Sequence, residues 1–379
     1  MRIALFSGNY NYLREGANQA LNVLVRYLEA SAGCEVRVYS PVTDTPAFEP
    51  AGTLVPVPSV ALPVRGEFRL ALRLPAQIRD DIARFRPQIV HVSTPDILGT
   101  RAQTFARQLG VPIVASMHTL FETYLDYYRI GWARPLVEAH LRRFYRRADH
   151  VLAPTPDLVE TLRRMRGDGA ASVWSRGIDR NLFNPARRDT VWRAAQGIAP
   201  DEVIVLFFGR VVLEKGVEIF VSVVRALQQR GLPVRALVIG AGPAEDRFKD
   251  LPGTIRTGHL EGPALARAVA SADLLLSPST TETFGNIMLE AMASGLPVVS
   301  ADTASARGML SGSTAGILCS PLDVQAYADA IAGLFGSVER RNAMGAAAMD
   351  ASMAYSWDEA SQSVERIYRS LVSGEQARP

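Results

Sequence analysis

Short apolar runs alternate with amphipathic stretches along the whole chain. The runs are rich in Val, Ile and Leu, are bounded by Gly or Pro, and lie at Arg2–Ser7, Glu35–Ser40, Gln88–Ser93, Pro112–Met117, His150–Ala153, Ser172–Trp174, Glu202–Gly209, Val234–Gly240, Thr254–Thr257, Leu274–Ser277 and Pro297–Ser300. The stretches between them, such as Ala17–Glu29 and Val217–Gln229, carry apolar residues at helical spacing. This alternation predicts βαβ units and parallel sheets with helices on both faces.

The alternation breaks once, between Arg176 and Pro200, where Pro185, Arg187 and Arg188 interrupt it. We therefore predict an α/β fold of two doubly wound domains with a cleft between them. In such sheets ligands gather at the carboxyl ends of the strands. The last segment, Ser356–Val372, is predicted to be an amphipathic helix with acidic residues in its first turn.

The composition predicts a globular protein without a membrane-spanning helix, a signal peptide or a disulfide framework. The chain has 379 residues, of which 48% are apolar and 21% charged, as in a packed globular protein of two or three domains. The longest uncharged stretches contain Pro or several Gly and Ser, and fall short of the roughly 20 apolar residues of a spanning helix. The apolar run Ile3–Phe6 is too short for a signal peptide. With only Cys34 and Cys319, a reducing cytoplasm is the expected compartment.

The net charge of +3 is carried by the first half of the chain, because acidic residues slightly outnumber basic ones in the second half. Only two lysines occur, Lys215 and Lys249, and every other basic side chain apart from histidine is arginine. A coding preference for Arg explains this, and within it each lysine draws attention to its surroundings.

The strongest candidate motif runs from Glu282 to Glu290 and follows the predicted strand Leu274–Ser277. A helix is expected to begin near Gly285, and its free N–H groups and dipole would make an anion site. Glu290 shares a helical face with Asn286, and a carboxylate there can accept two hydrogen bonds from a ribose diol. The alternative is that Glu282 caps the helix and that Glu290 is merely solvated.

A second motif, Phe207–Gly216, places two cations after a buried strand. Arg210 and Lys215 lie on the loop that precedes the predicted helix Val217–Gln229. Two cations at the carboxyl end of a strand suit a diphosphate, although an ordinary charged surface loop would look the same.

Two glycine-containing loops give weaker signals. Val238–Glu245 resembles the start of a dinucleotide fingerprint, but Glu245 stands where the third glycine belongs, so a tight turn is the simpler interpretation. The loop Ser7–Gly16 ends at a helix start, where Gly16 would let a phosphate or sugar approach the backbone.

His118 ends the predicted strand Pro112–Met117 and so falls at a carboxyl edge. A lone histidine more often has a structural role. Only the position of His118, at a carboxyl edge where ligands bind, favours a functional one. No histidine pair has metal-ligand spacing on one helix, and no Asp-x-Asp occurs. Serine-hydrolase and P-loop motifs are also absent from the sequence.

The segment 121–147 mixes aromatic residues with arginines. Such a mixture suits an anionic membrane surface, a solvated helix with an aromatic core face, or nucleic acid. The candidate acceptor or membrane residues in it are Tyr124, Tyr127, Tyr128, Arg129 and Trp132.

Taken together, these residues resemble family four retaining glycosyltransferases. The resemblance rests on the Glu282/Glu290 pair, on the loop from Gly209 to Gly216, on the turn Val238–Pro243 and on the run that continues through Gly295 and Pro297 to Val298. It extends over essentially the whole chain, with the more specific motifs in the second half. It implies the GT-B fold of two facing Rossmann-like domains. Residues 1–180 would bind the acceptor, residues 181–355 the nucleotide sugar, and residues 356–379 would form a helix crossing back to the first domain.

The resemblance also implies a role for each donor-site residue. Glu290 would hold the ribose, while Arg210 and Lys215 would neutralise the diphosphate with help from the N–H groups around Phe284 and Gly285. Gly16 would sit in the loop facing the diphosphate. The residues expected to bind the donor are Gly16, Arg210, Lys215, Phe284, Gly285, Asn286 and Glu290.

The catalytic residues implied by the resemblance are His118 and Glu282, both beside the donor sugar. Fixed cations and helix N–H groups would stabilise the departing phosphate, and the scheme requires no metal and no cofactor beyond the nucleoside-diphosphate sugar. A UDP-sugar is favoured over a GDP-sugar. Many relatives carry Asn or Pro-Asn before Gly177, whereas this chain has Ser175 and Arg176, so Arg176 is predicted to face an acidic donor sugar.

Within the family, His118-Thr119, Tyr124–Tyr128 and Arg176–Asp179 look most similar to glycolipid-forming members such as sulfoquinovosyl- and mannosyl-lipid synthases. The expected partners are therefore a nucleotide sugar and a lipid acceptor, with no nucleic acid and no protein partner. The expected location is the cytoplasm, peripheral on the inner face of the cytoplasmic membrane.

Three alternatives remain open from the sequence. The same chemistry could act on a polyprenyl-linked or soluble glycan. A dinucleotide-dependent oxidoreductase would use Val238–Glu245 instead. A non-enzymatic two-lobed sugar-binding protein would leave the Glu282/Glu290 and Arg210/Lys215 sets unexplained.

Overall fold

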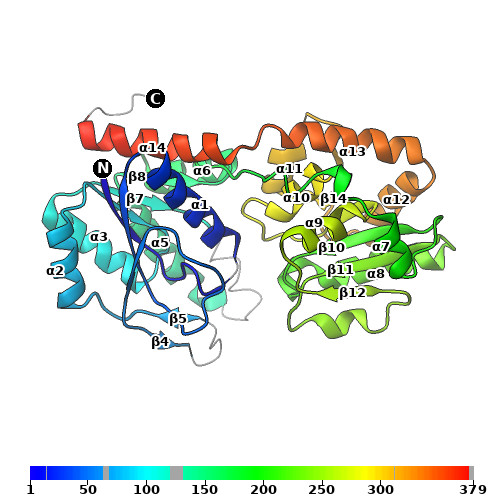
Figure 1. Cartoon of the computed structure of the whole chain (residues 1–379), viewed down its shortest axis with the longest axis horizontal. Helices are drawn as coiled ribbons and strands as arrows, with labels where there is room; N and C mark the ends of the chain where they lie inside the picture. The colour runs from blue at the N-terminus through cyan, green and yellow to red at the C-terminus, as the bar shows by residue number, and fades with distance from the viewer. Residues whose placement is uncertain (14, 63–67, 120–130, 311, 375–379) are drawn as a thin grey trace. The chain divides into compact units, whose positions relative to one another are not determined.

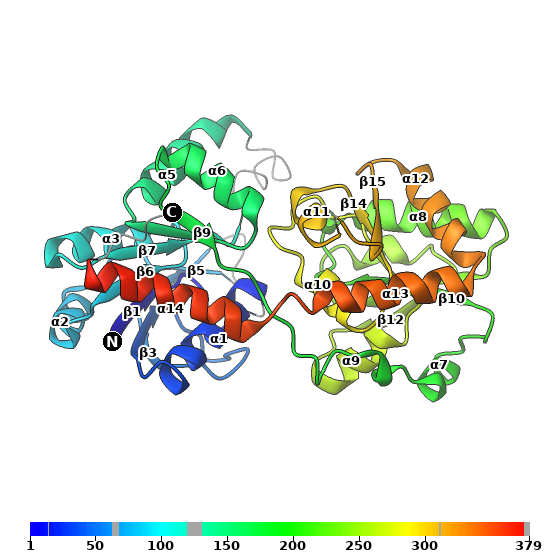
Figure 2. The same ribbon diagram turned by 90° about the horizontal axis from the view of Figure 1, so that it is seen from above.

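The computed structural model describes residues 1–13, 15–62, 68–119, 131–310 and 312–374. The chain divides into two compact units, which Figures 1 and 2 show from two directions. Unit 1 comprises Met1–Gly177 together with Trp357–Pro379, and unit 2 comprises Ile178–Ser356. The chain therefore leaves unit 1, builds unit 2 and returns.

Unit 1 is built on a seven-stranded parallel sheet with the order β3-β2-β1-β6-β7-β8-β9. Its strands are β1 (Arg2–Phe6), β2 (Glu35–Ser40), β3 (Thr53–Pro56), β6 (Ile89–Val92), β7 (Ile113–Ser116), β8 (His150–Ala153) and β9 (Ala171–Val173). A separate antiparallel pair is formed by β4 (Val60–Ala61) and β5 (Arg69–Leu70).

Helices cover both faces of this sheet because successive strand residues point to opposite sides. In β1, Ile3 and Leu5 pack with the helices α1 (Gly16–Ala30) and α14 (Trp357–Ser373). Ala4 and Phe6 face the other helices of the unit. Those helices are α2 (Ala76–Phe85), α3 (Ile97–Leu109), α5 (Arg134–Arg146), which the short η1 (Gly131–Ala133) precedes, and α6 (Pro156–Arg166).

Unit 2 is built on a six-stranded parallel sheet with the order β12-β11-β10-β13-β14-β15. Its strands are β10 (Val203–Phe208), β11 (Val234–Ile239), β12 (Ile255–Gly258), β13 (Leu274–Ser277), β14 (Val298–Ala301) and β15 (Gly316–Cys319).

The helices of unit 2 also lie on both faces of its sheet. One core contains residues of α8 (Val217–Gln229) and α12 (Val324–Phe335). The opposite core contains residues of α9 (Gly262–Ala270), α10 (Asn286–Ala293), α11 (Ala304–Leu310) and α13 (Val338–Ser352). The remaining elements are η2 (Pro185–Arg187), α7 (Thr190–Ala195), η3 (Leu213–Lys215) and η4 (Glu245–Phe248).

The predicted α/β class with two parallel sheets is confirmed. Four of the described strands were not predicted. Of these, β3, β4 and β15 lie in the long uncharged stretches rich in Gly, Pro and Ser, where the apolar pattern is weakest, and β5 has only two residues. Within the described residues, no helix combines the length and the apolar character needed to cross a membrane.

Candidate functional site

Two loops of unit 2 meet at the carboxyl ends of the neighbouring strands β10 and β13. Lys215, in η3 after β10, forms an ion pair with Glu282, which follows β13, with 2.5 Å between Nζ and Oε1. The hydroxyls of Ser279 and Thr281 both donate to the carbonyl oxygen of Glu214 at 3.3 Å. The structure thus joins two motifs that lie 67 residues apart in the chain.

A glycine allows these two loops to pack closely. Gly216 has a φ of +74°, and a Cβ atom on it would lie 2.8 Å from the carbonyl oxygen of Pro278. A side chain there would force the loops apart, and the positive φ already favours glycine. Gly216 therefore holds Lys215 against the segment that carries Glu282.

The helix α10 follows directly and begins where the sequence predicted it. Gly285 is its N-cap, with a φ of 101° and no side-chain cap. The N–H groups of the first turn have no acceptor within a helix, and the dipole favours an anion at this end. Phe284, just before the cap, is buried and packs edge-on against Tyr355 at 5.6 Å between ring centroids. Asn286 opens the helix as its first residue.

Arg210 is exposed and lies directly after Gly209, at the end of β10. A Cβ atom on Gly209 would lie 3.7 Å from Cγ2 of Ile287, in the first turn of α10. The end of β10 thus lies beside the amino end of α10. This edge of the sheet carries two cations and a helix N-terminus, a combination that suits a diphosphate.

Glu290 lies on α10, one turn after Asn286. Burial raises the pKa of its carboxyl group from 4.5 to about 8. Among the described residues, no hydrogen bond or cation offsets this desolvation of the carboxylate. Ligand hydroxyls that donate to the charged form of this partly buried group would offset its desolvation.

The predicted site residues of unit 1 gather at a different sheet. Gly16 is the first residue of α1. His118 follows β7, and Arg176 follows β9, at the carboxyl edge of the sheet. A guanidinium nitrogen of Arg176 donates to Nδ1 of His118 at 3.0 Å.

Arg176 is only 4% exposed, and its guanidinium also donates to the carbonyl oxygens of Trp174 and Ser175, at 2.9 and 3.2 Å. The cation lies over the Trp174 ring, 5.0 Å from its centroid. Burial lowers the pKa of Arg176 to about 10. These contacts anchor the guanidinium within unit 1, whereas contact with an acidic donor sugar stays a prediction.

Sequence reasoning missed three side chains that lie behind His118. Nε2 of His118 lies 2.8 Å from Oγ of Ser116, which lies 2.8 Å from Nε2 of His91. Nδ1 of His91 is hydrogen-bonded to the hydroxyl of Tyr368. Polar residues within otherwise apolar strand runs were the available signal for His91 and Ser116, but nothing local linked Tyr368 to them.

Four of the candidate acceptor residues, Tyr124, Tyr127, Tyr128 and Arg129, lie outside the described residues. Trp132, in η1, is described and 77% exposed, and Leu136 on α5 is 69% exposed. The arginines exposed on α5 are Arg142, Arg143 and Arg146.

The glycine turn Val238–Glu245 differs from a dinucleotide-binding loop. The backbone N–H of Gly242 donates to Oε1 of Glu245 at 2.7 Å, so the chain's own carboxylate occupies a place that a phosphate would take. The turn leads into the short 3₁₀ helix η4 rather than an α-helix. The interpretation as a tight turn fits this geometry better than the oxidoreductase alternative.

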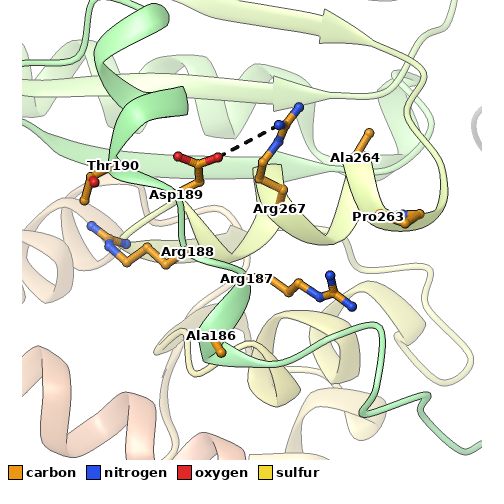
Figure 3. Close-up of a pocket in the computed structure, with 8 residues that line it drawn as sticks. All are labelled: Ala186, Arg187, Arg188, Asp189, Thr190, Pro263, Ala264 and Arg267. Atoms are coloured by element: carbon orange, nitrogen blue, oxygen red, sulfur yellow. Dashed lines mark ion pairs between the residues drawn. The ribbon is translucent and has the colours of Figure 1, made fainter.

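Unit 2 also has a pocket of about 580 Å³, shown in Figure 3, between η2 and the start of α9. Its arginines are already engaged. Arg188 pairs with Asp273 at 2.6 Å, Arg267 lies 3.9 Å from Asp189, and Arg187 donates to the carbonyl oxygen of Asn181. None of the predicted donor residues lines this pocket.

Comparison with known families agrees with this geometry. Residues 14–182 match the family model described as Glycosyltransferase Family 4, and residues 202–337 match the model described as Glycosyl transferases group 1. The first match falls in unit 1 apart from its last residues, and the second falls within unit 2. The chain therefore belongs to the glycosyltransferase family that these two models describe, one for each half of the chain.

Three curated relatives illustrate its range. The sulfoquinovosyl transferase SQD2 of Arabidopsis thaliana is 32% identical over 94% of this chain and 71% of its own length. A GDP-mannose-dependent alpha-mannosyltransferase of Mycolicibacterium smegmatis is 31% identical over 94% of both chains. The alpha-monoglucosyldiacylglycerol synthase of Acholeplasma laidlawii is 24% identical over 79% of this chain and 80% of its own.

Among solved structures, the sucrose-phosphate synthase of Thermosynechococcus elongatus superposes with a TM-score of 0.79 at 20% identity, over 99% of this chain and 100% of its own. This similarity identifies the fold as that of the GT-B glycosyltransferases.

Proposed function

We propose that this protein is a retaining glycosyltransferase that moves a sugar from a nucleoside-diphosphate sugar to a hydroxyl of a membrane lipid. The observation that carries the donor part is Glu290, a partly buried carboxylate for which the structure gives no hydrogen-bond or ionic partner among the described residues. It lies on a helix whose amino end adjoins the Arg210–Lys215 loop. A ribose diol would supply the missing hydrogen bonds, and the diphosphate would meet the cations and the helix N-terminus.

In the proposed reaction the bonds that break and form belong to the donor and the acceptor, not to the protein. The bond between the anomeric carbon and the phosphate oxygen breaks, a bond from the acceptor oxygen to that carbon forms, and the acceptor proton passes to the departing phosphate. Negative charge grows on the diphosphate as the bond breaks, so fixed donors at Lys215, Arg210 and the start of α10 lower the barrier. No step in this scheme calls for a metal.

Lys215 and Glu282 serve this step as a pair. The Glu282 carboxylate holds the ammonium group of Lys215 in place before the donor arrives. The diphosphate would share that ammonium, and the Glu282 carboxylate would then accept from a hydroxyl of the donor sugar. Preorganised charge of this kind costs no rearrangement during reaction.

A lipid acceptor is supported by the surface of unit 1 and by a relative. Trp132 and Leu136 are exposed beside the arginines of α5, a mixture that suits an anionic lipid surface. The relative from Acholeplasma laidlawii is an alpha-monoglucosyldiacylglycerol synthase, whose product is a glycolipid by its name. The competing acceptor class is a soluble or polyprenyl-linked glycan.

The test of the donor site is a thermal-shift panel with UDP, GDP, ADP and NAD. Ligand binding stabilises the folded state by mass action, so one nucleoside diphosphate is expected to raise the melting temperature. Glu290→Gln keeps the side-chain volume but cannot take the charged form that the nucleotide would favour. It is expected to weaken binding about 10- to 100-fold, as for lost hydrogen bonds to a charged group. Glu218→Gln, an exposed glutamate on α8, is the matched control and should bind like the parent.

Either of two results would count against the donor site. One is a shift with NAD alone, and the other is no shift with any diphosphate. The retaining outcome is tested separately, by NMR of the product, whose anomeric configuration should equal that of the donor. An inverted product would overturn retention and leave the donor site standing.

A further inference from the structure

Unit 1 contains a continuous chain of hydrogen-bonded side chains that runs from α14 to the carboxyl edge of its sheet. Tyr368 bonds to His91, His91 to Ser116, Ser116 to His118, and His118 to Arg176. The distances from His91 onward are 2.8, 2.8 and 3.0 Å. Tyr368 comes from a helix 277 residues further along the chain than His91.

The hydrogen-bond donors and acceptors of this network determine the tautomer of His118. Arginine has no acceptor, so the Arg176 guanidinium must donate to Nδ1 of His118, which therefore carries no hydrogen. In the neutral ring the hydrogen then resides on Nε2, which donates to Oγ of Ser116. The tautomer of His118 thus follows from its two neighbours.

Burial makes this arrangement rigid. His91, Ser116 and Tyr368 are fully buried, and Trp174 packs edge-on against both histidines at 6.0 and 5.3 Å between ring centroids. Burial lowers the pKa of His91 to about 3 and, together with Arg176 and His91, holds that of His118 well below its ordinary value. Both rings therefore stay neutral at physiological pH, and a buried donor or acceptor left unpaired would be costly.

The two ends of this hydrogen-bond network, Tyr368 and Arg176, differ in their surroundings. Tyr368 lies in the apolar core between α1, α14 and the sheet. His118 and Arg176 lie after β7 and β9, at the edge where parallel sheets bind ligands.

We propose that Tyr368, His91 and Ser116 are positioning residues that hold His118 in its Nε2–H form and thereby fix the Arg176 guanidinium for the transfer step. This inference rests on the proposed function, because transfer is the step that the positioned groups would serve. It also makes α14 a part of the site's support, through one phenol oxygen.

The test compares Tyr368→Phe and Ser116→Ala with the matched control Ser172→Ala. Ser172 also bonds to a histidine, His150, between two strands of the same sheet, but this pair has no link to His118 among the described residues. We expect about 10- to 100-fold lower kcat in the two test variants, as for a small misplacement of reacting groups, and parental kcat in the control. Affinity for the nucleoside diphosphate should be unchanged in all three, because the proposed donor residues apart from Gly16 lie in unit 2, and the backbone of Gly16 is not altered by these substitutions.

Nitrogen-15 NMR of histidine-labelled protein supplies a readout independent of turnover. The parent should show His118 with a protonated Nε2 and an unprotonated Nδ1. Ser116→Ala removes the hydrogen-bond acceptor of Nε2–H and should shift the Nε2 resonance, while Ser172→Ala leaves it in place. Near-UV circular dichroism checks folding, and Tyr368→Phe keeps the ring volume should Ser116→Ala fold poorly.

The outcomes separate the two proposals. No turnover by the parent with any donor and acceptor would count against the proposed function. Two results would overturn the positioning role. One is a kcat equal to that of the parent in folded Tyr368→Phe and Ser116→Ala variants, and the other is a His118 that is protonated on Nδ1 in the parent.

Discussion

At the scale of single residues, Glu290 combines a charge-bearing group with an environment that disfavours charge. Its pKa of about 8 means that the ligand-free site holds a proton at neutral pH. Two hydroxyls donating to the carboxylate would favour the charged form and lower that pKa. Nucleotide binding is therefore expected to release up to one proton per site near pH 7 and none near pH 10.

Isothermal titration calorimetry in buffers of different ionisation enthalpy measures that proton. The observed enthalpy should vary with the buffer for the parent at pH 7, and Glu290→Gln should remove most of the variation. A buffer-independent enthalpy at pH 7 for the parent would contradict the link between Glu290 and the nucleotide.

The same residue predicts how stability depends on pH. Between about pH 4.5 and 8 the folded state keeps a proton that the unfolded chain has lost, so this carboxyl group's contribution to stability falls as the pH rises through that window. Relative to the parent, Glu290→Gln should gain stability from pH 5 to pH 9. Thermal melts of both proteins across this range check the prediction, and parallel curves would refute it.

Predictions from the sequence were most useful for individual residues that lie near one another in the chain. Glu282, Gly285 and Glu290 fall within one strand–turn–helix unit, so their spacing alone indicated a site. The pairing of Lys215 with Glu282 needed the order of the strands, which brings β10 beside β13. The network behind His118 needed α14, and no local pattern indicates where a distant helix will pack.

At the scale of elements, the junction between η3 and α8 depends on Gly216. Gly216→Ala would add a Cβ atom against the backbone of Pro278 at a positive φ. Gly231→Ala, after α8, is the matched control, because it has a similar φ of +77° but open space around the new atom. We expect about 1 kcal/mol of destabilisation for the control and about 2–4 kcal/mol for Gly216→Ala, measured by denaturant unfolding.

Gly216→Ala should also weaken nucleotide binding, because Lys215 adjoins the strained position. Equal destabilisation of the two variants would show that the close approach to Pro278 carries no weight.

The exposed face of α5 predicts electrostatic binding to anionic vesicles. Arg142→Gln with Arg143→Gln should remove about 1 kcal/mol of attraction per arginine, and 0.5 M salt should have a similar effect on the parent. Leu136→Ser should also weaken binding, whereas Leu322→Ser, equally apolar and 80% exposed in unit 2, should not. Cosedimentation with vesicles of anionic and of neutral lipid measures each case, and parental binding by the arginine variant would favour a soluble or polyprenyl-linked acceptor.

Elements with strong periodicity were predicted within a residue or two. Val217–Gln229 is α8 as expected, and the final helix begins at Trp357, one residue after the predicted start. The weakly patterned strands β3 and β15 were not recognised, since partners in the sheet stabilise them more than local sequence does. The turn after β11 was predicted, but the short 3₁₀ form of the following helix was not.

At the scale of the whole molecule, the chain has two compact units, which are proposed to bind different ligands. Nucleotide is expected to stabilise unit 2, whereas removal of residues 357–374 should destabilise unit 1 by exposing the core that contains Val364 and Tyr368. Differential scanning calorimetry of the shortened chain should show two transitions, of which only the one with the higher midpoint responds to nucleotide. A single transition that moves as a whole would contradict independent units.

The return of the chain to unit 1 has a consequence for synthesis on the ribosome. Residues 178–356 leave the ribosome before α14 does, so unit 2 can begin to fold while unit 1 still lacks the helix that covers Leu5 and Trp174. Until α14 emerges, that apolar face of unit 1 stays uncovered, so chaperones could bind it. The domain translated first is therefore the one finished last, and the support of His118 is completed only with its closing helix.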